Sequence, residues 1–394
     1  MKYTSVRAVL GVVVLMFLMQ ANPQDLWAQT TNGTILGAVR DSAGGVVLGA
    51  NISARSTETG AVRSVTTDSS GAYQILSLPA GAYDIEASYQ GFKTELRKGI
   101  VVTVAAPATV NFTLEVGEMQ EKVVVTARPQ ELNTTDASMG GLVGETAVRE
   151  LPLNGRDWLQ LATLQAGVVG GIGQQSAAAS TNSRAARGNG VALVISGNRP
   201  TGNVFLVDGL VVNDQANGSP GSGLNVNLGV EAIREFRVFT DEYTAEHGRS
   251  TGGVVTAIFK SGTNQFHGNA YEFLRNSALD ARNFFDSCPT TEPNCKDGGR
   301  PPFRRNQFGA SAGGPIKKGK TFIFGDFEAL RQSKGITHNT VTLSPNALNG
   351  SIVPIAPSVR PYLGFFAPAN QNISPDGLSG IYHFVGTRIG NEKY

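Results

Sequence analysis

The N-terminal segment restricts how this chain can meet a membrane. Lys2 and Arg7 are followed by twelve consecutive apolar residues, Ala8 to Met19, and then by Leu26-Trp27-Ala28. This pattern predicts a secretory signal peptide over residues 1–28 that is cleaved after Ala28; an uncleaved anchor is the alternative. Crossing a bilayer core of about 30 Å takes roughly 20 apolar helical residues, and no later segment of the sequence approaches that length. We therefore expect export, and any membrane span must consist of β-strands.

The composition agrees with a mainly β fold. Glycine accounts for 48 residues, while 41% of all residues are hydrophobic and 16% are charged. Turn-rich β proteins need many positions at positive φ, which glycine adopts without steric cost. The 33 basic and 31 acidic residues are interspersed, so no basic tract indicates nucleic acid and no acidic tail indicates a disordered arm. We expect no nucleic-acid partner.

Residues 34–116 alternate short strand-like segments with turns such as Asp68-Ser69-Ser70-Gly71. About seven strands at a spacing of roughly 8–12 residues are typical of a β-sandwich. The predicted core residues are Tyr73, Ile75, Tyr83, Ile85 and Phe92. The predicted strands are 34–40, 49–56, 61–67, 72–77, 82–90, 93–104 and 109–116.

Four pieces of this segment follow a known order: Gly37-Ala38-Val39-Arg40-Asp41, Gly49-Ala50-Asn51-Ile52, Thr67-Asp68 with Gly71-Ala72-Tyr73, and Leu78-Pro79-Ala80-Gly81-Ala82-Tyr83. Together they resemble the carboxypeptidase regulatory-like domain, which we place at residues 29–117. The resemblance implies an accessory folding domain. It implies no peptidase activity, because the family is named after a companion domain. Some related folds bind glycans through exposed aromatic residues, but packing explains Tyr89 better.

A different pattern begins near Val143 and mixes a helix with buried strands. Asn154, followed three residues later by Asp157 and then by apolar residues at helical spacing, predicts a capped helix that ends near Gly167. Residues 170–190 are rich in small and polar residues and predict a loop. The predicted strands are 191–196, 204–207, 236–239 and 254–259, with a turn at Asp208-Gly209 and a helical turn at 230–233.

Five motifs occur in order within this second region: Leu151 to Asp157, Ile195 to Arg199, Phe205 to Gly209, Glu231 to Ile233, and Gly252 to Thr256. In this order they resemble the plug domain of TonB-dependent outer-membrane receptors. The resemblance implies a small α/β plug, which we place at residues 141–262. The motif residues that we single out are Asn154, Gly155, Arg156, Asn198, Arg199, Asp208 and Gly209.

After the plug, longer amphipathic segments follow at 266–275, 305–312 and 321–330. Each has about the length of a tilted membrane strand, roughly 9–11 residues. A long polar connection at 276–303 and a short one at 314–320 give the loop asymmetry of outer-membrane barrels. With the plug, residues 263–394 resemble the first barrel strands of a TonB-dependent receptor of the Oar-like branch. A plugged barrel of 22 strands needs roughly 220 residues in strands alone, so we expect an N-terminal fragment with an incomplete barrel.

Between the sandwich and the plug lies a region, residues 118–140, with a β-branched extended core. Its core resembles the TonB box, with Lys122 where a threonine is more usual. Such a segment can add as a strand to the exposed sheet edge of a partner. The alternative is that it forms the last strand of the sandwich. The residues expected to bind the partner are Glu121, Lys122, Val123, Val124, Val125, Thr126 and Ala127.

Sequence motifs for chemistry are weak. Residues 314–321 match the spacing of a phosphate-binding loop, but the β-like residues after them exclude the helix that such a loop requires. The four histidines lack partners at metal-ligand spacing, and no nucleophile elbow occurs. We expect no catalytic, cofactor or metal site. Cys288 and Cys295, in a predicted external loop of an exported protein, can form a local disulfide or remain a free pair.

These features together predict a mainly β chain with four parts: signal peptide, β-sandwich, α/β plug and the first strands of a transmembrane β-barrel. The resemblance implies energised uptake across the outer membrane, with the N-terminal domain in the periplasm. The implied partners are TonB, outer-membrane lipid and an unknown extracellular ligand, which could be a glycan, a peptide or a metal chelate. The alternative is a secreted β-sandwich protein that binds glycans or mediates adhesion without a pore.

Overall fold

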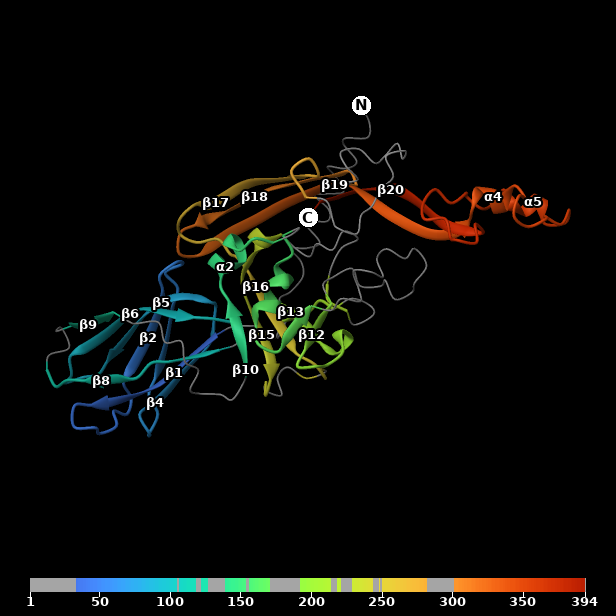
Figure 1. Ribbon diagram of the computed structural model, residues 1–394. Coiled ribbons are helices and arrows are strands. Elements are labelled where there is room, and N and C mark those ends of the chain that lie inside the picture. The colour runs from blue at the N-terminus through green and yellow to red at the C-terminus, as the bar shows by residue number, and fades with distance from the viewer. Residues whose placement is uncertain are drawn as a thin grey trace, which may run out of the picture.

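A computed structural model describes residues 33–104, 106–117, 122–126, 139–153, 156–170, 192–213, 218–220, 229–243, 248, 250–281 and 301–393. The described residues form three β-rich parts, which follow one another along the chain (Figure 1). No helix among the described residues is long and apolar enough to span a membrane. The predicted signal peptide and Glu121, Ala127, Asn154, Gly155, Cys288 and Cys295 lie outside the described residues.

The first part is a β-sandwich, as its strand spacing predicts. One sheet has the order β4-β1-β7, with β8 also paired to β1, and the other has the order β3-β2-β5-β6-β9. The strands are β1 (Gly33–Asp41), β2 (Asn51–Ser56), β3 (Val62–Thr66), β4 (Ala72–Leu78), β5 (Gly81–Ser88), β6 (Thr94–Val102), β7 (Pro107–Thr109), β8 (Phe112–Leu114) and β9 (Lys122–Thr126).

The sandwich core contains the alternating apolar residues of both sheets. Tyr73, Ile75, Tyr83 and Ile85 are buried in it, whereas Phe92 is half-buried and packs against its edge. The Tyr73 hydroxyl donates to the carbonyl oxygen of Val110 at 2.6 Å, which satisfies its polar end inside the core. The β-sandwich is therefore held mainly by apolar burial between its two sheets.

Strand β9 contains five residues of the TonB-box-like segment. It lies parallel to β6, and the paired residues run from Thr94 and Lys122 to Lys98 and Thr126. In this structure the segment thus takes the place of a last sandwich strand, which was the alternative left open by the sequence.

The second part, residues 139–260, is called the central unit below. Its five-stranded sheet has the order β10-β15-β16-β13-β14, and a separate pair joins β11 to β12. The elements are β10 (Met139–Val143), α2 (Glu145–Glu150), η1 (Trp158–Leu164), β11 (Val168–Gly170), β12 (Leu193–Ile195), η3 (Pro200–Gly202), β13 (Val204–Val207), β14 (Leu210–Val211), η4 (Val230–Ala232), β15 (Ile233–Asp241) and β16 (Val254–Phe259).

Two local predictions for the central unit need correction. The helix begins at Trp158 and is a 3-10 helix, and the Asp157 side chain caps it by accepting from the Leu159 amide at 3.1 Å. The predicted start of the helix is therefore three residues too early, and the predicted cap residue Asn154 lies outside the described residues. Residues 139 and 140, which were assigned from the sequence to the region 118–140, belong instead to β10 (Met139–Val143), which pairs with β15. Glycines within β10 hid this strand from a pattern search.

The third part is an antiparallel sheet in the order β17-β18-β19-β20, called the outer sheet below. Its strands are β17 (His267–Asn276), β18 (Phe303–Lys317), β19 (Thr321–Leu343) and β20 (Ser379–Lys393). β19 is much longer than the predicted 321–330 and extends toward the short helices α4 (Pro345–Leu348) and α5 (Arg360–Leu363), far from the sandwich (Figure 1).

Side chains alternate across the outer sheet as the sequence predicts. Tyr271 and Phe273 share one face, and both contact the central unit through Arg156. Leu274, the residue after Phe273, points to the opposite face and is 64% exposed. Phe327 of β19 lies on that same face and is 47% exposed. One face of the sheet therefore meets the central unit and the other presents apolar residues outward.

Asp157 gives a testable pH dependence. It is 1% exposed, and one carboxylate oxygen has no hydrogen-bond partner. Burial raises its pKa to about 7, although the Leu159 amide opposes the shift. Because the unfolded carboxyl has an ordinary pKa near 3.8, the folded state holds more protons between these values. Stability should therefore fall as the pH rises from about 4 to about 7 and stay low above it.

We predict that Asp157→Asn, which keeps an acceptor for the cap but removes the charge, stabilises the central unit at pH 8. At about 1.4 kcal/mol per pKa unit, the gain is at most on the order of 4 kcal/mol, and it should vanish near pH 4. The measurement is urea unfolding of a chain that begins after Ala28, followed by the fluorescence of buried Trp158, which is then its single tryptophan. Equal or lower stability of the variant at pH 8 would contradict the prediction.

Candidate functional site between the central unit and the outer sheet

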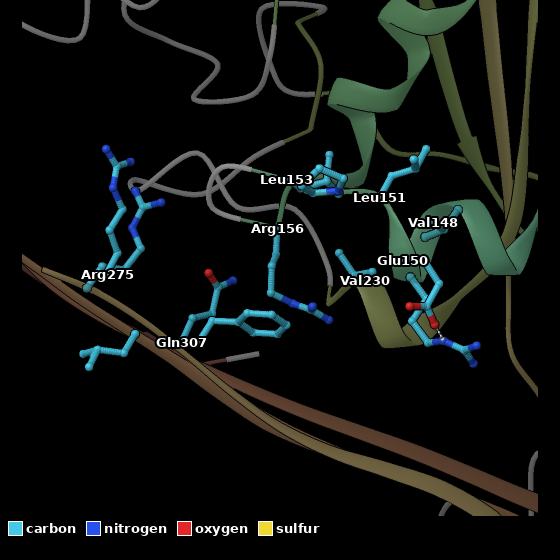
Figure 2. Close-up of a pocket in the computed structure, with 13 residues that line it drawn as sticks. Val148, Glu150, Leu151, Leu153, Arg156, Val230, Arg275 and Gln307 are labelled. Carbon is cyan, nitrogen blue, oxygen red and sulfur yellow. Dashed lines mark hydrogen bonds and ion pairs between the residues drawn. The ribbon is translucent and has the colours of Figure 1, made fainter. Parts of the chain in front are cut away.

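Arg156 is the centre of the contact between the central unit and the outer sheet. Its backbone has φ +54°, a left-handed conformation that is uncommon for residues other than glycine. The side chain is 8% exposed. Its guanidinium carbon lies 4.2 Å from the ring centre of Tyr271 and 4.6 Å from that of Phe273, both on β17. Figure 2 shows the side chain between the two parts.

Two buried carboxylates from different parts of the chain neutralise this guanidinium. Arg156 Nη2 lies 3.2 Å from an oxygen of Glu231 on η4, and Arg156 Nε lies 3.9 Å from an oxygen of Glu328 on β19. Glu231 and Glu328 are 2% and 0% exposed. The second oxygen of Glu231 lies 3.5 Å from Lys260, which also pairs with Glu145 at 3.1 Å. The charges form a continuous network from α2 to the outer sheet.

Glu328 is also held by hydrogen bonds within the outer sheet. The Tyr271 hydroxyl donates to one of its oxygens at 2.5 Å, and the Gln307 side-chain amide donates to the other. This close approach requires Gly309, which is directly opposite Glu328. A Cβ at Gly309 would lie 2.5 Å from the Tyr271 hydroxyl oxygen. Gly229 of the central unit likewise permits a close approach to the outer sheet, since a Cβ there would lie 2.5 Å from a carboxylate oxygen of Asp326.

These ionic and hydrogen-bonded contacts hold the central unit against the outer sheet. Desolvating ionic groups costs several kcal/mol for each ion, and only good geometry with further hydrogen bonds offsets that cost. Removal of one partner leaves an uncompensated buried charge, which typically costs about 3–5 kcal/mol. The network therefore favours a single docked position of the central unit and penalises partial separation from the outer sheet.

A cavity of about 660 Å³ lies beside Arg156. Leu151 and Leu153 of the central unit line one side, and Arg275 and Gln307 of the outer sheet line the other (Figure 2). Arg275 and Arg305 are directly paired across β17 and β18. The space separates the two parts on one side of the charge network, so the contact between them is concentrated at Arg156.

A second contact joins the sandwich to the central unit. Two Arg234 nitrogens donate to the two oxygens of Glu58 at 2.9 and 2.7 Å. The Val104 amide donates to Glu235 at 2.5 Å, and burial raises the pKa of that carboxyl. The backbone carbonyl of Glu58 also accepts from the Asn264 amide at 3.0 Å. Arg234 and Glu235 stand at the start of β15, three residues after Glu231.

Of the predicted motif residues that the structure describes, one lies in this network, Arg156. Asp208 and Gly209 instead form the two-residue turn between β13 and β14, with φ values of +47° and +82°. Asn198 lies in a turn after β12, where its amide nitrogen donates to the carbonyl oxygen of Ile195. The adjacent Arg199 is exposed. Asp208, Gly209 and Asn198 thus take turn positions, and Arg199 has extended backbone directly before η3.

Sequence reasoning missed the partners of Arg156. Glu231 was part of a recognised motif and Tyr271 lies in the amphipathic segment 266–275, so both signals were present. Nothing local marked Glu328 or Gln307, because their roles depend on strand register. Among the described residues, no group of three His, Cys, Asp or Glu side chains could hold a metal ion.

Comparison with known proteins identifies both ends of the chain. Residues 34–115 match the carboxypeptidase regulatory-like domain, and residues 258–392 match an outer membrane beta barrel domain. These matches confirm the predicted fold class and the two resemblances at these ranges. The outer membrane β-barrel domain also argues against the secreted alternative without a pore.

The chain is also similar to whole proteins. It is 28% identical over 325 residues to the TonB-dependent transporter Oar of Myxococcus xanthus; the match covers 80% of this chain and 28% of that protein. Among solved structures, the outer membrane transporter YddB of Escherichia coli is 15% identical, with a TM-score of 0.35, over 64% of this chain and 30% of YddB. The siderophore receptor PirA of Acinetobacter baumannii is 18% identical, with a TM-score of 0.32, over 55% of this chain and 32% of PirA.

We predict that Arg156→Lys weakens the docking of the central unit. Lysine keeps the charge but loses the planar contact with two rings and the reach to two carboxylates, a loss of about 2–4 kcal/mol. The measurement is the urea midpoint for exposure of Trp158, again in a chain that begins after Ala28. Arg149→Lys is the matched control, because Arg149 is 43% exposed and pairs at the surface with Glu150. Equal midpoints for both variants would contradict a special role of Arg156.

Proposed function

We propose that this homologue of TonB-dependent transporters, which joins a carboxypeptidase regulatory-like domain to an outer membrane β-barrel domain, takes part in energised uptake across the outer membrane. The central unit is the plug. The barrel strands form its wall, and the sandwich lies on the periplasmic side. The partner is TonB, and it engages residues 121–127. The extracellular ligand is a glycan, a peptide or a metal chelate.

The observation that carries this proposal is the Arg156 network. A protein that only needs a stable core can replace a buried ion network by apolar residues with little loss or with a gain in stability. A plug must stay docked with low leakage and still be able to move. Directional charge contacts, concentrated beside a cavity, hold it in one position. Because a displaced plug leaves buried charges without partners, its displacement requires external work.

The contacts also supply a route for that work. β9 is paired to β6 of the sandwich, and the sandwich is fixed to β15 through Glu58 and Arg234. β15 follows η4 directly, and η4 carries Glu231, the partner of Arg156. A pull on β9 therefore reaches the Arg156 network through the sandwich and β15. No covalent step is required, and the chain acts as a transporter component without enzymatic chemistry.

The experiment that tests the coupling is site-specific photo-crosslinking in cells that carry the complete gene. A photoreactive amino acid replaces Val124 of β9, which is 53% exposed. We expect a crosslink to TonB. Val62 of β3 is the matched control, since it is 56% exposed on the opposite edge strand of the same sheet. No TonB adduct at Val124, or equal adducts at both positions, would sink the proposed coupling site.

A further inference from the structure

The cavity of about 660 Å³ beside Arg156 has two unlike sides. Val148, Leu151, Leu153 and Val230 line it from the central unit, and all four are labelled in Figure 2. Leu151 is 39% exposed although it lies at a contact between two parts of the chain. A largely apolar cavity of this size with a few polar groups is typical of small-molecule sites. An apolar body in the cavity would remove this leucine surface from water.

The opposite side of the cavity carries two arginines at one register position of the outer sheet. Arg275 of β17 and Arg305 of β18 are directly paired, and both line the cavity. Arg275 is two residues beyond Phe273, so it lies on the face of the sheet that meets the central unit. Figure 2 shows Arg275 and Gln307 on the same side of the outer sheet. Like charges directly opposite each other on a sheet are destabilising, so this placement favours a compensating anion.

Neighbouring groups hold the two guanidiniums in place. The ring centre of Phe303 lies 5.0 Å from the guanidinium carbon of Arg275 and 5.5 Å from that of Arg305. Arg305 Nε donates to the neutral side-chain oxygen of Gln332 at 2.8 Å. Arg275 Nε lies 3.1 Å from a carboxylate oxygen of Asp280. Because a rigid guanidinium fork matches the geometry of a carboxylate or a phosphate, an oxyanion between the two forks would offset their repulsion.

The other charged groups of the cavity also favour anions over cations. Among the described residues that line it, Arg149, Arg156, Arg275 and Arg305 are cationic, whereas Glu150 is acidic. Glu150 is paired with Arg149 at 2.8 Å. The cavity therefore combines an apolar side with a cationic side, and a ligand that fits both must itself be amphipathic and negatively charged.

We propose that this cavity binds a small amphipathic anion. Its carboxylate or phosphate head lies between Arg275 and Arg305, and its apolar body packs against Leu151 and Leu153. A neutral glycan lacks such a head, so the inference narrows the ligand classes of the proposed function to anions. Binding itself does not depend on transport; that the bound anion is a solute in transit rests on the proposed function.

Binding of small model anions to the complete gene product, purified in detergent, tests the inference. The probes are phenylacetate and phenyl phosphate, which differ in their head groups, and neutral phenylacetamide is the reference. Their Kd values are measured by saturation-transfer NMR. Arg305→Gln removes one guanidinium, and Leu151→Ser shortens the apolar side. Arg304→Gln is the matched control, because Arg304 is exposed and lies on the opposite face of β18.

We expect both anions to bind more tightly than phenylacetamide, and tighter binding of one of them would identify the head group. Arg305→Gln should weaken anion binding about tenfold and Arg304→Gln less than about twofold. Leu151→Ser should weaken the binding of both anions. Equally tight binding of phenylacetamide, no binding of either anion to the unsubstituted protein, or an unchanged Kd in Arg305→Gln would overturn the inference.

The failure of this inference and the failure of the proposed function are distinguishable. Anion binding as expected without a TonB crosslink at Val124 would leave the site in place and remove the coupling function. A crosslink without anion binding would overturn the anion site alone.

Discussion

A buried guanidinium cannot remain in a protein interior without opposite charges, and the arrangement of this chain depends on how Arg156 meets that requirement. Its counter-charges come from η4 of the central unit and from β19 of the outer sheet. Its flat faces are covered by aromatic rings of β17. Three segments that are far apart in sequence must therefore be in register before the charge is compensated. The network is therefore complete only when the central unit is fully docked on the outer sheet.

The central unit connects the sandwich to the outer sheet. It contacts the outer sheet through Glu231 and Arg156, and it contacts the sandwich through Arg234 and Glu235. Glu231 and Arg234 lie on consecutive elements, so both contacts bear on one short stretch of backbone. A load that enters at the sandwich is applied next to the residue that compensates Arg156. Under the proposed coupling function, this proximity would let the sandwich transmit force to the Arg156 network without a ligand site of its own.

The sequence predicted elements whose signals are local. Strand β13 at 204–207 and strand β16 at 254–259 agree with their predicted ranges, because each is a short apolar run next to a turn residue. β10 was missed because two of its five residues are glycine. The pairing of β9 was left open, since an exposed valine-rich segment can extend its own sheet or that of a partner. The partners of Arg156 could not be found without knowing the register between β18 and β19.

The most direct measurement uses single-molecule force spectroscopy to pull on residues 122–126 of the complete gene product, anchored in a bilayer by its barrel. The account predicts that the first rupture separates the central unit from the wall while the sandwich stays folded and attached. Arg156→Lys should lower the force of this first event. If the sandwich unfolds or detaches first, with the central unit still docked and with no effect of Arg156→Lys, the Arg156 network is not the contact that the applied force must break.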